Sequence, residues 1–360
     1  MGGKEIQYIK EAFDTNWISP VGPHIDRFEK DIQDYAKVNH AVALSSGTAA
    51  IHLALIMLGV KQGDEVLCSS FTYIGSCNPI MYLKAIPIFI DSEWDSWNLD
   101  PDILEEAIKD RIKKGKRPKA LILVHLYGMP AKLNKIMSIA HRYGVPVIED
   151  AAEALGSSYE GKQLGTFGEI GIYSFNGNKI ITTSGGGVLV SNKKKYIEGA
   201  KFLSTQARNP APHYEHSEIG YNYRMSNICA AIGIGQLEVL DSHIACRRNI
   251  YIHYKKNLER LGYSFVEEKS YVFSNRWLTT ALIDPEITGR NREDIRMHLE
   301  KVNIESRPLW KPMHLQPIFK NAIFYNASVC NKLFESGLCL PSGSNLSNDQ
   351  LNSIITRLTL

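Results

Sequence analysis

The lysine at position 179 stands in a sequence setting that suits covalent chemistry with a carbonyl group. It lies in the run Tyr173–Gly187 among small and apolar residues, and three consecutive glycines, Gly185–Gly187, follow it. Desolvation by apolar neighbours lowers the pKa of a lysine, which favours the neutral amine that attacks a carbonyl. Glycines beside it let the backbone approach a flat ligand closely. A solvated surface lysine is the alternative interpretation.

A second reactive group, Asp150, ends an expected buried strand 29 residues before Lys179. In α/β sheets, ligands bind at the carboxyl ends of the strands. A carboxylate at that place could keep the ring nitrogen of pyridoxal phosphate protonated, which makes the ring an electron sink. The same position also serves Mg²⁺ or a ribose, so Asp150 alone leaves these alternatives open.

The segment Ser45–Ala50 lies between an expected strand and a helix rich in Ala and Leu. Free N–H groups at the start of that helix, together with its macrodipole and the neighbouring hydroxyls, predict a phosphate cradle. An ordinary Ser or Thr N-cap is the competing interpretation.

Motifs of several other function classes are missing or lie in the wrong context. The chain has no GxxxxGK[ST] loop and no GxSxG elbow, and its glycine pair Gly233–Gly235 lies inside a helical pattern. His213 and His216 lie in a loop interrupted by prolines, without a third ligand at a recognisable spacing, so we predict no metal site. The net charge of +3 is too small to indicate a nucleic-acid partner.

The composition indicates an ordinary globular chain. Its 360 residues are 44% hydrophobic and 22% charged. No apolar run approaches the roughly 20 residues that cross a bilayer, and the N-terminus lacks the apolar stretch of a secretory signal. The six cysteines form no CxxC pair, as expected for reduced thiols. We therefore expect a cytoplasmic protein without a membrane partner.

Short apolar runs alternate with helical patterns along the first half of the chain, which predicts a doubly wound α/β layer. A later helical pattern over 226–261, with Ser226 as its cap and Gly262 as its stop, could bridge two domains. We predict a large cofactor-binding domain over 1–235 and a small domain over 236–360. The expected strands are 41–44, 65–69, 86–90, 120–125, 145–148, 170–175 and 187–191, and the expected helices among them are 47–58, 74–83, 101–114 and 133–143.

The motifs around these residues resemble those of the DegT/DnrJ/EryC1/StrS sugar aminotransferases along nearly the whole chain. The resemblance implies the type I pyridoxal-phosphate fold of aspartate aminotransferase, an α/β fold whose large domain has a central, mostly parallel sheet and is followed by a smaller C-terminal α/β domain. The lysine loop and the segment 310–317 most resemble the branch that makes UDP-N-acetylbacillosamine. The motifs that carry the resemblance are Asn16–Pro20, Ser46–Ala50, Phe71–Tyr73, His125–Gly128, Glu149–Ala154, Ser174–Gly187, Gly220–Met225 and Arg307–His314.

The resemblance also implies roles for single residues toward pyridoxal 5′-phosphate. Lys179 would bond covalently to the cofactor and carry a proton, and Asp150 would pair with the ring nitrogen. Backbone amides of Gly47 and Thr48, with the hydroxyl of Ser174, would hold the phosphate.

Further implied roles concern the rim of the site and the partner subunit. Tyr73 would stack on the cofactor ring, and Asn222 would reach the phosphate in the neighbouring subunit, which implies a homodimer with shared active sites. Glu153 stands where many members carry Gln or His near the phenolic oxygen of the cofactor, so we expect it to be protonated or to share a proton. Relatives also usually carry several residues before Met1–Gly3, so we expect a short-start version of the family.

The substrates implied are L-glutamate as amino donor and a nucleotide-linked 4-keto-6-deoxy sugar as acceptor, most closely UDP-4-keto-6-deoxy-N-acetylglucosamine, in a ping-pong cycle. Arg307, Trp310, Lys311 and His314 are the candidate acceptor residues, because planar cations and aromatic rings suit a diphosphate and a base. The pair Arg276–Trp277 has the same character, and a domain-interface cluster is the competing interpretation. The alternatives are a GDP- or dTDP-linked acceptor, amination at C3, a sugar dehydratase of the same fold, and a non-catalytic binding protein.

Overall fold

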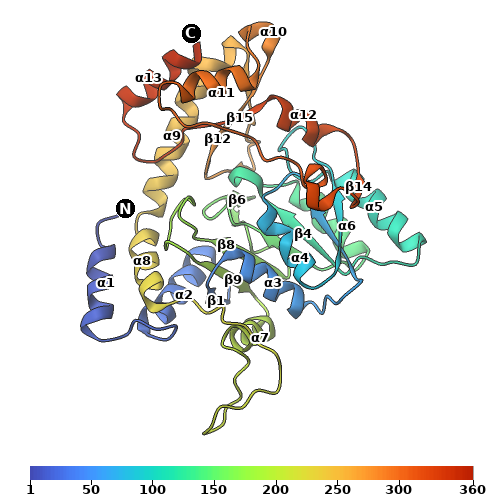
Figure 1. The fold of residues 1–360 in the computed structure, drawn as a ribbon, viewed down its shortest axis with the longest axis vertical. Coiled ribbons are helices and arrows are strands. Elements are labelled where there is room, and N and C mark those ends of the chain that lie inside the picture. Colours follow the sequence, from blue (N-terminus) through green and yellow to red (C-terminus); the bar gives the residue numbers. More distant parts are fainter. Residues whose placement is uncertain (360) are drawn as a thin grey trace.

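The protein is described from a computed structural model, which covers residues 1–359. Figure 1 shows a large sheet with helices on both sides and, above it, a smaller α/β part joined through the helix α9 (Leu240–Leu258). A central, mostly parallel sheet with helices on both sides, followed by a smaller C-terminal α/β part, agrees with the fold expected from the sequence.

The large sheet has eight strands in the order β1-β9-β8-β5-β4-β2-β3-β14. The strands from β8 to β14 in that order run parallel, while β9 is antiparallel to both of its neighbours. Since β1 and β8 each pair antiparallel with β9, their carboxyl ends lie at one edge, with those of β5 and β4. The bounds are β1 His40–Leu44, β2 Glu65–Ser69, β3 Ile86–Ile90, β4 Ala120–Val124, β5 Val147–Asp150, β8 Ile170–Ser174, β9 Gly187–Ser191 and β14 Ile323–Tyr325.

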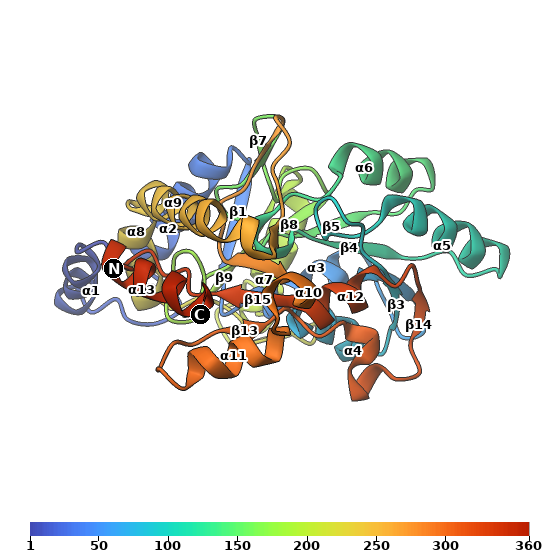
Figure 2. The ribbon, with the colours of Figure 1, turned by 90° about the horizontal axis from the view of Figure 1, so that it is seen from above.

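Both faces of this sheet are buried, which explains why its strands are continuous apolar runs in the sequence. One core lies between the sheet and α2, α5, α6 and α8, and a second core lies between the sheet and α3, α4 and α7. Figure 2 shows α5 and α6 on the face opposite α4. The bounds are α2 Pro23–Ala36, α3 Gly47–Met57, α4 Asn78–Tyr82, α5 Pro101–Lys113, α6 Leu133–Arg142, α7 Lys194–Ser204 and α8 Asn227–Leu237.

The C-terminal part is built on a four-stranded antiparallel sheet, β10-β12-β15-β13, whose core is shared with α9, α11 and α13. One piece of it returns to the large sheet, because β14 pairs with β3. The carboxylate of Asp91, which follows β3, accepts backbone N–H groups of Ala327, Val329 and Cys330 and fixes this return. The bounds are β10 Tyr263–Phe265, β12 Thr279–Ile283, β13 Arg307–Pro308, β15 Gly337–Leu340, α10 Pro285–Thr288, α11 Arg292–Glu300, α12 Val329–Ser336 and α13 Asn348–Thr359; a further small sheet joins β11 Val272–Phe273, β6 Ser158–Tyr159 and β7 Lys162–Gln163.

The helical pattern over 226–261 forms two helices rather than one, so the expectation of a single helix was wrong. α8 and α9 meet at a bend of 60°, because α8 packs on α1 (Glu5–Asp14) and α2 whereas α9 packs on the small sheet. The expected ends are confirmed: Ser226 accepts the N–H of Cys229 at 3.2 Å, and Gly262 is left-handed at φ 87°. No single helix of residues 1–359 is long and apolar enough to cross a membrane; α8 and α9 meet that requirement only as a bent pair.

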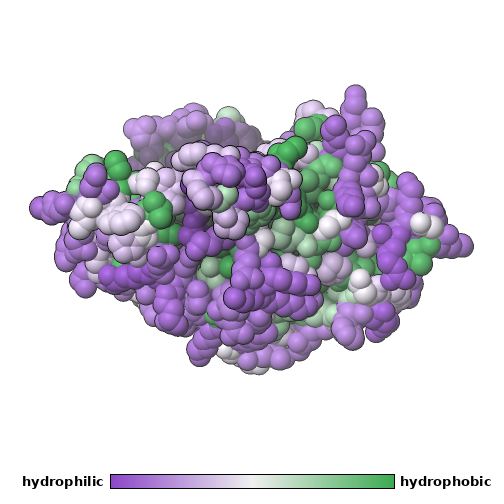
Figure 3. Space-filling model, turned by 90° about the horizontal axis from the view of Figure 1, so that it is seen from below, coloured by the Kyte–Doolittle hydropathy of each residue, from purple (hydrophilic) through white to green (hydrophobic). Residues whose placement is uncertain are grey.

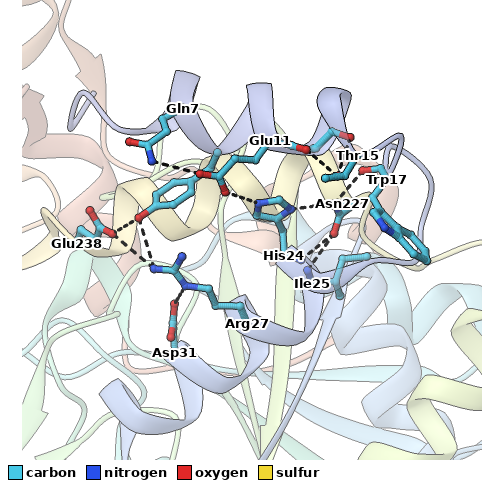
Figure 4. Close-up of polar contacts among 12 residues, drawn as sticks. Gln7, Glu11, Thr15, Trp17, His24, Ile25, Arg27, Asp31, Asn227 and Glu238 are labelled. Carbon is cyan, nitrogen blue, oxygen red and sulfur yellow. Dashed lines mark hydrogen bonds and ion pairs between the residues drawn. The ribbon is translucent and has the colours of Figure 1, made fainter.

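The N-terminal helices are tied to α8 by a network of side chains (Figure 4). The amide of Asn227 accepts the N–H groups of His24 and Ile25 at 3.0 and 3.2 Å and donates to the carbonyl of Trp17 at 2.8 Å. A Cβ on Gly22, which has φ 150°, would lie 2.6 Å from the same amide. This close packing fixes the turn between α1 and α2.

Candidate active site

Lys179 lies in the loop between β8 and β9, at the carboxyl edge of the large sheet. Its side chain is 11% exposed. The ammonium nitrogen lies 3.6 Å from Oε1 of Glu153 and 4.3 Å over the ring of Trp277. The indole of Trp277 in turn donates to the carbonyl of Asn178 at 2.9 Å, which anchors the loop. A buried carboxyl and an aromatic face thus enclose the amine.

Asp150 ends β5, next to β8, and is buried. Its Oδ2 accepts the hydroxyl proton of Ser76 at 2.6 Å, and its Oδ1 accepts the N–H of Ala152 at 3.2 Å. The hydroxyl of Ser76 also lies 2.8 Å from that of Thr72, so Thr72 donates to Ser76. Both oxygens of Asp150 therefore accept hydrogen bonds, from Ser76 and from Ala152.

Glu153 lies in the segment that follows β5 and is buried beside Lys179. Burial is the largest influence and raises the pKa of its carboxyl. The nearby Lys179 and the N–H of Tyr127, 2.7 Å from Oε2, act in the opposite direction, and the charge of Asp150 adds to the rise. The protonated form is therefore favoured more than in a solvated glutamate, in the direction expected from the sequence.

A narrow cradle lies where the start of α3 meets the ends of β8 and β9. Ser46 caps α3 by accepting the N–H of Ala49 at 3.0 Å. The N–H groups of Gly47 and Thr48, in the first turn of the helix, have no acceptor within the helix. A Cβ on Gly47 would lie 3.1 Å from the Cβ of Ser174. A Cβ on Gly187 would lie 2.4 Å from the carbonyl carbon of Ser46, so glycine is required there.

The residues at this edge of the sheet fit pyridoxal phosphate. The cradle offers backbone N–H groups and the hydroxyl of Ser174 to a phosphate, as helix N-termini do. The carboxylate of Asp150 suits a protonated ring nitrogen, and the amine of Lys179 suits a carbonyl carbon. The donor set therefore matches each polar end of that cofactor.

Two further predicted cofactor residues lie at the rim of the site. Tyr73 is 52% exposed, and its ring centre lies 5.3 Å from that of Trp310. The Cβ position of Gly75 lies between the ring of Tyr73 and the hydroxyl of Thr48, 3.1 and 3.2 Å away, which places Tyr73 beside the cradle. Asn222 is exposed and pairs with Thr205 in an isolated bridge.

A cleft of about 890 Å³ lies next to the lysine loop, and it brings two of the four candidate acceptor residues together. Asn178 and Trp277 line it with Arg307 and Trp310. The guanidinium of Arg307 is exposed and lies 2.6 Å from Glu305. A cation beside aromatic rings in an open cleft suits an anionic ligand that carries a base.

The other two candidate residues lie outside this cleft lining. Lys311 is exposed. His314 uses Nδ1 in a contact of 2.7 Å with the hydroxyl of Ser70, and its ring stacks on Phe324 at 3.7 Å. Burial lowers the pKa of His314. Arg276 points away, because it donates to the carbonyl of Val266 at 2.9 Å and lies 3.7 Å over the ring of Tyr251.

Sequence reasoning gave no role to Ser76 or Tyr127, both of which contact the acidic residues of the site. Ser76 lies in an ordinary-looking segment, and nothing in its neighbourhood signals a bond to Asp150. Tyr127 lies in the quoted motif His125–Gly128, and the glycine after it was a usable sign of an unusual turn.

The chain is similar along nearly its whole length to known aminotransferases. The family model described as "DegT/DnrJ/EryC1/StrS aminotransferase family" matches residues 1–359. The chain is 55% identical over 360 residues to a protein of Bacillus subtilis (strain 168) named "Putative pyridoxal phosphate-dependent aminotransferase EpsN"; the match covers 99% of this chain and 92% of that one. It is 41% identical to a GDP-perosamine synthase of Escherichia coli O157:H7, over 97% of this chain and 93% of that one. The crystal structure of a DegT DnrJ EryC1 StrS aminotransferase from Brucella abortus is similar with a TM-score of 0.92 at 28% identity, over 99% of this chain and 94% of that one.

Proposed function

The chain belongs to the DegT/DnrJ/EryC1/StrS aminotransferase family, and from this premise we propose that it moves the amino group of L-glutamate to a 4-keto-6-deoxy sugar carried by a nucleoside diphosphate. It is an enzyme that uses pyridoxal 5′-phosphate and acts on sugar nucleotides. The amino donor, the position aminated and the nucleotide are the parts that this proposal adds.

The observation that carries the proposal is the enclosure of Lys179 by Glu153 and Trp277, with Asp150 at the end of the adjacent strand. Bound pyridoxal phosphate supplies a carbonyl carbon and an electron-withdrawing ring. The amine of Lys179 would hold that carbon and would carry a proton at Nζ, and the carboxylate of Asp150 would pair with the ring nitrogen. Glu153, a carboxyl whose pKa is raised by burial, lies 3.6 Å from the amine.

The acceptor is placed in the cleft of about 890 Å³ beside the lysine loop. Arg307 can pair with a phosphate there, and Trp310 offers a ring face to a base. Lys311 and His314 remain candidates for more peripheral roles toward the sugar or its phosphates.

The nucleotide is proposed as UDP, on the resemblance of the lysine loop and of the segment 310–317 to the bacillosamine branch. GDP is the second candidate, because relatives that are 41%, 37% and 38% identical are named GDP-perosamine synthases. The two candidates differ in the base alone, so one panel of acceptors separates them.

A homodimer with shared active sites is part of the proposal. Asn222 is exposed. It lies near the cradle, because the backbone carbonyl of the next residue, Tyr223, accepts the N–H of Ser45 at 2.7 Å. Large apolar side chains are exposed on the same molecule, and Figure 3 shows apolar patches on the face seen from below. The exposed apolar residues near the N-terminus and on α4 include Phe13, Trp17, Ile18, Val21, Met81 and Tyr82.

The test separates the two halves of the reaction. The holoenzyme is mixed with L-glutamate alone, and the change in the cofactor spectrum is followed; the aminated enzyme is then mixed with UDP-, GDP- and dTDP-linked 4-keto-6-deoxy sugars, and the products are identified by mass. We expect the glutamate half-reaction and one preferred nucleotide sugar, UDP-linked first. A spectrum that glutamate leaves unchanged, or the absence of an amino sugar with all three acceptors, would overturn the proposal.

A further inference from the structure

Tyr127 joins the two halves of the site through its backbone and its side chain together. Its N–H donates to Oε2 of Glu153 at 2.7 Å. Its hydroxyl accepts the N–H of Trp310 at 2.9 Å, across a sequence separation of 183 residues. One residue thus contacts both the carboxyl beside Lys179 and the loop that lines the acceptor cleft.

The backbone of Tyr127 is left-handed, with φ 53° and ψ 21°. A bulky side chain rarely adopts this conformation, and it persists where the surroundings fix it, often at functional sites. Here the following residue, Gly128, is packed so closely that a Cβ would lie 1.9 Å from Oδ1 of Asn275. His125, two residues earlier, is buried, and its Nε2 lies 3.0 Å from Oε2 of Glu149. The turn that presents Tyr127 is therefore held from both sides.

The ring of Tyr127 is nearly parallel to the rings of two tryptophans. Its centre is 6.4 Å from that of Trp277, at 19° between planes, and 6.2 Å from that of Trp310, at 13°. Trp277 also contacts Lys179, whose side-chain nitrogen lies 4.3 Å from the centre of the indole ring. Successive contacts between these three rings thus connect the amine of Lys179 with Trp310, which lines the cleft.

We propose that Tyr127 is a positioning residue that sets the acceptor loop Arg307–Lys311 relative to the Lys179–Glu153 pair and thereby controls the sugar acceptor but not the amino donor. The inference rests on the proposed function, because it assigns the cleft to the nucleotide sugar. The donor is small and needs the amine and the carboxyl. The acceptor also needs Arg307 and Trp310, whose loop is bonded to the tyrosine hydroxyl.

The substitution Tyr127→Phe tests this role, because it keeps the ring and the backbone N–H but leaves the N–H of Trp310 without its acceptor. We expect binding of UDP and of GDP, measured by calorimetry on the holoenzyme, to weaken about tenfold, as for loss of one buried hydrogen bond. The KM of the sugar half-reaction should rise by a similar factor, while the glutamate half-reaction stays within about twofold. Tyr127→Leu, which also removes the stack, should weaken binding further and shift the tryptophan fluorescence.

The matched control is Tyr263→Phe. Tyr263 is a buried tyrosine of the small domain whose hydroxyl donates to the carbonyl of Leu358 at 2.8 Å, outside the cleft lining. It should lower the melting temperature as much as Tyr127→Phe does and leave nucleotide binding unchanged.

Three results would overturn the inference: unchanged binding in Tyr127→Phe, no binding of either probe to the wild type, or equal slowing of both half-reactions. If instead the wild type aminates no sugar while Tyr127→Phe still weakens binding of UDP or GDP, the proposed function fails and the positioning role stands.

Discussion

The ammonium nitrogen of Lys179 lies 3.6 Å from Oε1 of Glu153, in a place where burial raises the pKa of that carboxyl. This separation is slightly longer than the roughly 2.6–3.2 Å over which a proton is transferred directly, so an exchange between the two groups needs a small approach or one bridging water. The N–H of Tyr127 fixes the other carboxylate oxygen, Oε2, at 2.7 Å, which orients Oε1 toward the amine. The pair therefore links Lys179 to the turn that contacts the loop Arg307–Lys311.

The first prediction concerns the substitution Glu153→Gln. The pKa of Glu153 is higher in the folded state than in the unfolded chain, so the folded protein keeps this proton at pH values where the unfolded chain has lost it. The unfolding free energy of the wild type therefore falls as pH rises from the unfolded pKa to the folded pKa. The Gln variant has no titratable group at this position and lacks this fall. Its unfolding free energy relative to the wild type should therefore rise between the two pKa values and stay constant above the folded pKa. The gain is roughly 1.4 kcal/mol for each pH unit between the two pKa values.

Urea unfolding at several pH values from about 3 to 8, a range that extends below the ordinary pKa of a glutamate, measures this difference. Glu238→Gln is the control of opposite sign, because hydrogen bonds from Tyr8 and from Lys4 lower the pKa of Glu238. That variant should lose stability at neutral pH and approach the wild type as pH falls through the folded pKa. A parallel pH dependence in both variants would contradict the prediction.

The second prediction concerns Lys179→Ala, which should abolish turnover. Lys179→Arg should not restore it, because a guanidinium stays protonated and cannot attack a carbonyl. The matched control is Lys162→Ala: Lys162 also lies 4.3 Å over an aromatic ring, that of Phe167, but on the small β6–β7 sheet. Steady-state rates of the three variants decide the matter, and wild-type turnover in Lys179→Ala would remove the lysine from the chemistry.

The third prediction concerns Asp150→Asn. The amide keeps the shape and the contact with the hydroxyl of Ser76, but it loses the charge that stabilises a protonated ring nitrogen. We expect kcat to fall about 100-fold or more, as for loss of a preorganised charge in an active site, with a smaller change in cofactor affinity. Asp241→Asn, which alters an acceptor of the Tyr35 hydroxyl away from the site, should leave both quantities unchanged. Full activity in Asp150→Asn would assign the residue a structural role.

The sequence predicted the strands of the large sheet closely, because strands buried on both faces are uninterrupted apolar runs whose ends are easy to locate. The strand expected over 65–69 is β2, and the one expected over 86–90 is β3. The pairing of β14 with β3 could not be predicted in this way. It joins three residues to a strand more than 200 positions away, and so short a run carries no periodicity of its own.

The same contrast holds for the site. Lys179 and Asp150 were located from local signals, a glycine-framed loop and the end of an apolar strand. The contact between Tyr127 and Trp310 depends on how two distant loops pack, and neither loop carries a signal of the other. For His314, the residue type suggested a ligand contact, which stays a prediction, whereas its contacts with Ser70 and Phe324 carry no signal in the sequence.

The fourth prediction concerns two glycines: Gly177, in the loop that carries Lys179, and Gly187, at the start of β9. A Cβ on Gly187 would lie 2.4 Å from the carbonyl carbon of Ser46, so Gly187→Ala must displace the start of α3. A Cβ on Gly177 would meet no heavy atom within 4 Å, which makes Gly177→Ala the matched control. We expect cofactor affinity, measured by equilibrium titration of the apoenzyme, to fall about tenfold or more in Gly187→Ala and to stay unchanged in Gly177→Ala. Equal affinities would show that the cradle tolerates the shift.

The fifth prediction concerns Arg307→Ala and the selectivity between donor and acceptor. Arg307 is exposed in the cleft and lies 2.6 Å from Glu305, so its loss should leave the fold intact. A diphosphate would lose a charge-assisted contact, and we expect the sugar half-reaction to lose about tenfold in kcat/KM. The glutamate half-reaction should continue at nearly the wild-type rate.

Stopped-flow spectra of the two half-reactions, recorded separately, measure both effects of Arg307→Ala. Arg142→Ala is the control, because Arg142 is an exposed arginine on α6 paired with Glu105 at 2.9 Å, outside the cleft lining. It should leave both half-reactions unchanged. If Arg307→Ala slowed both halves equally, the arginine would serve the fold or the donor carboxylate, and the diphosphate would have to be bound by other residues of the cleft, with Lys311 the next cation along the loop. Selective damage to the sugar half-reaction, together with the same selectivity in Tyr127→Phe, would place the acceptor on the loop that Tyr127 holds.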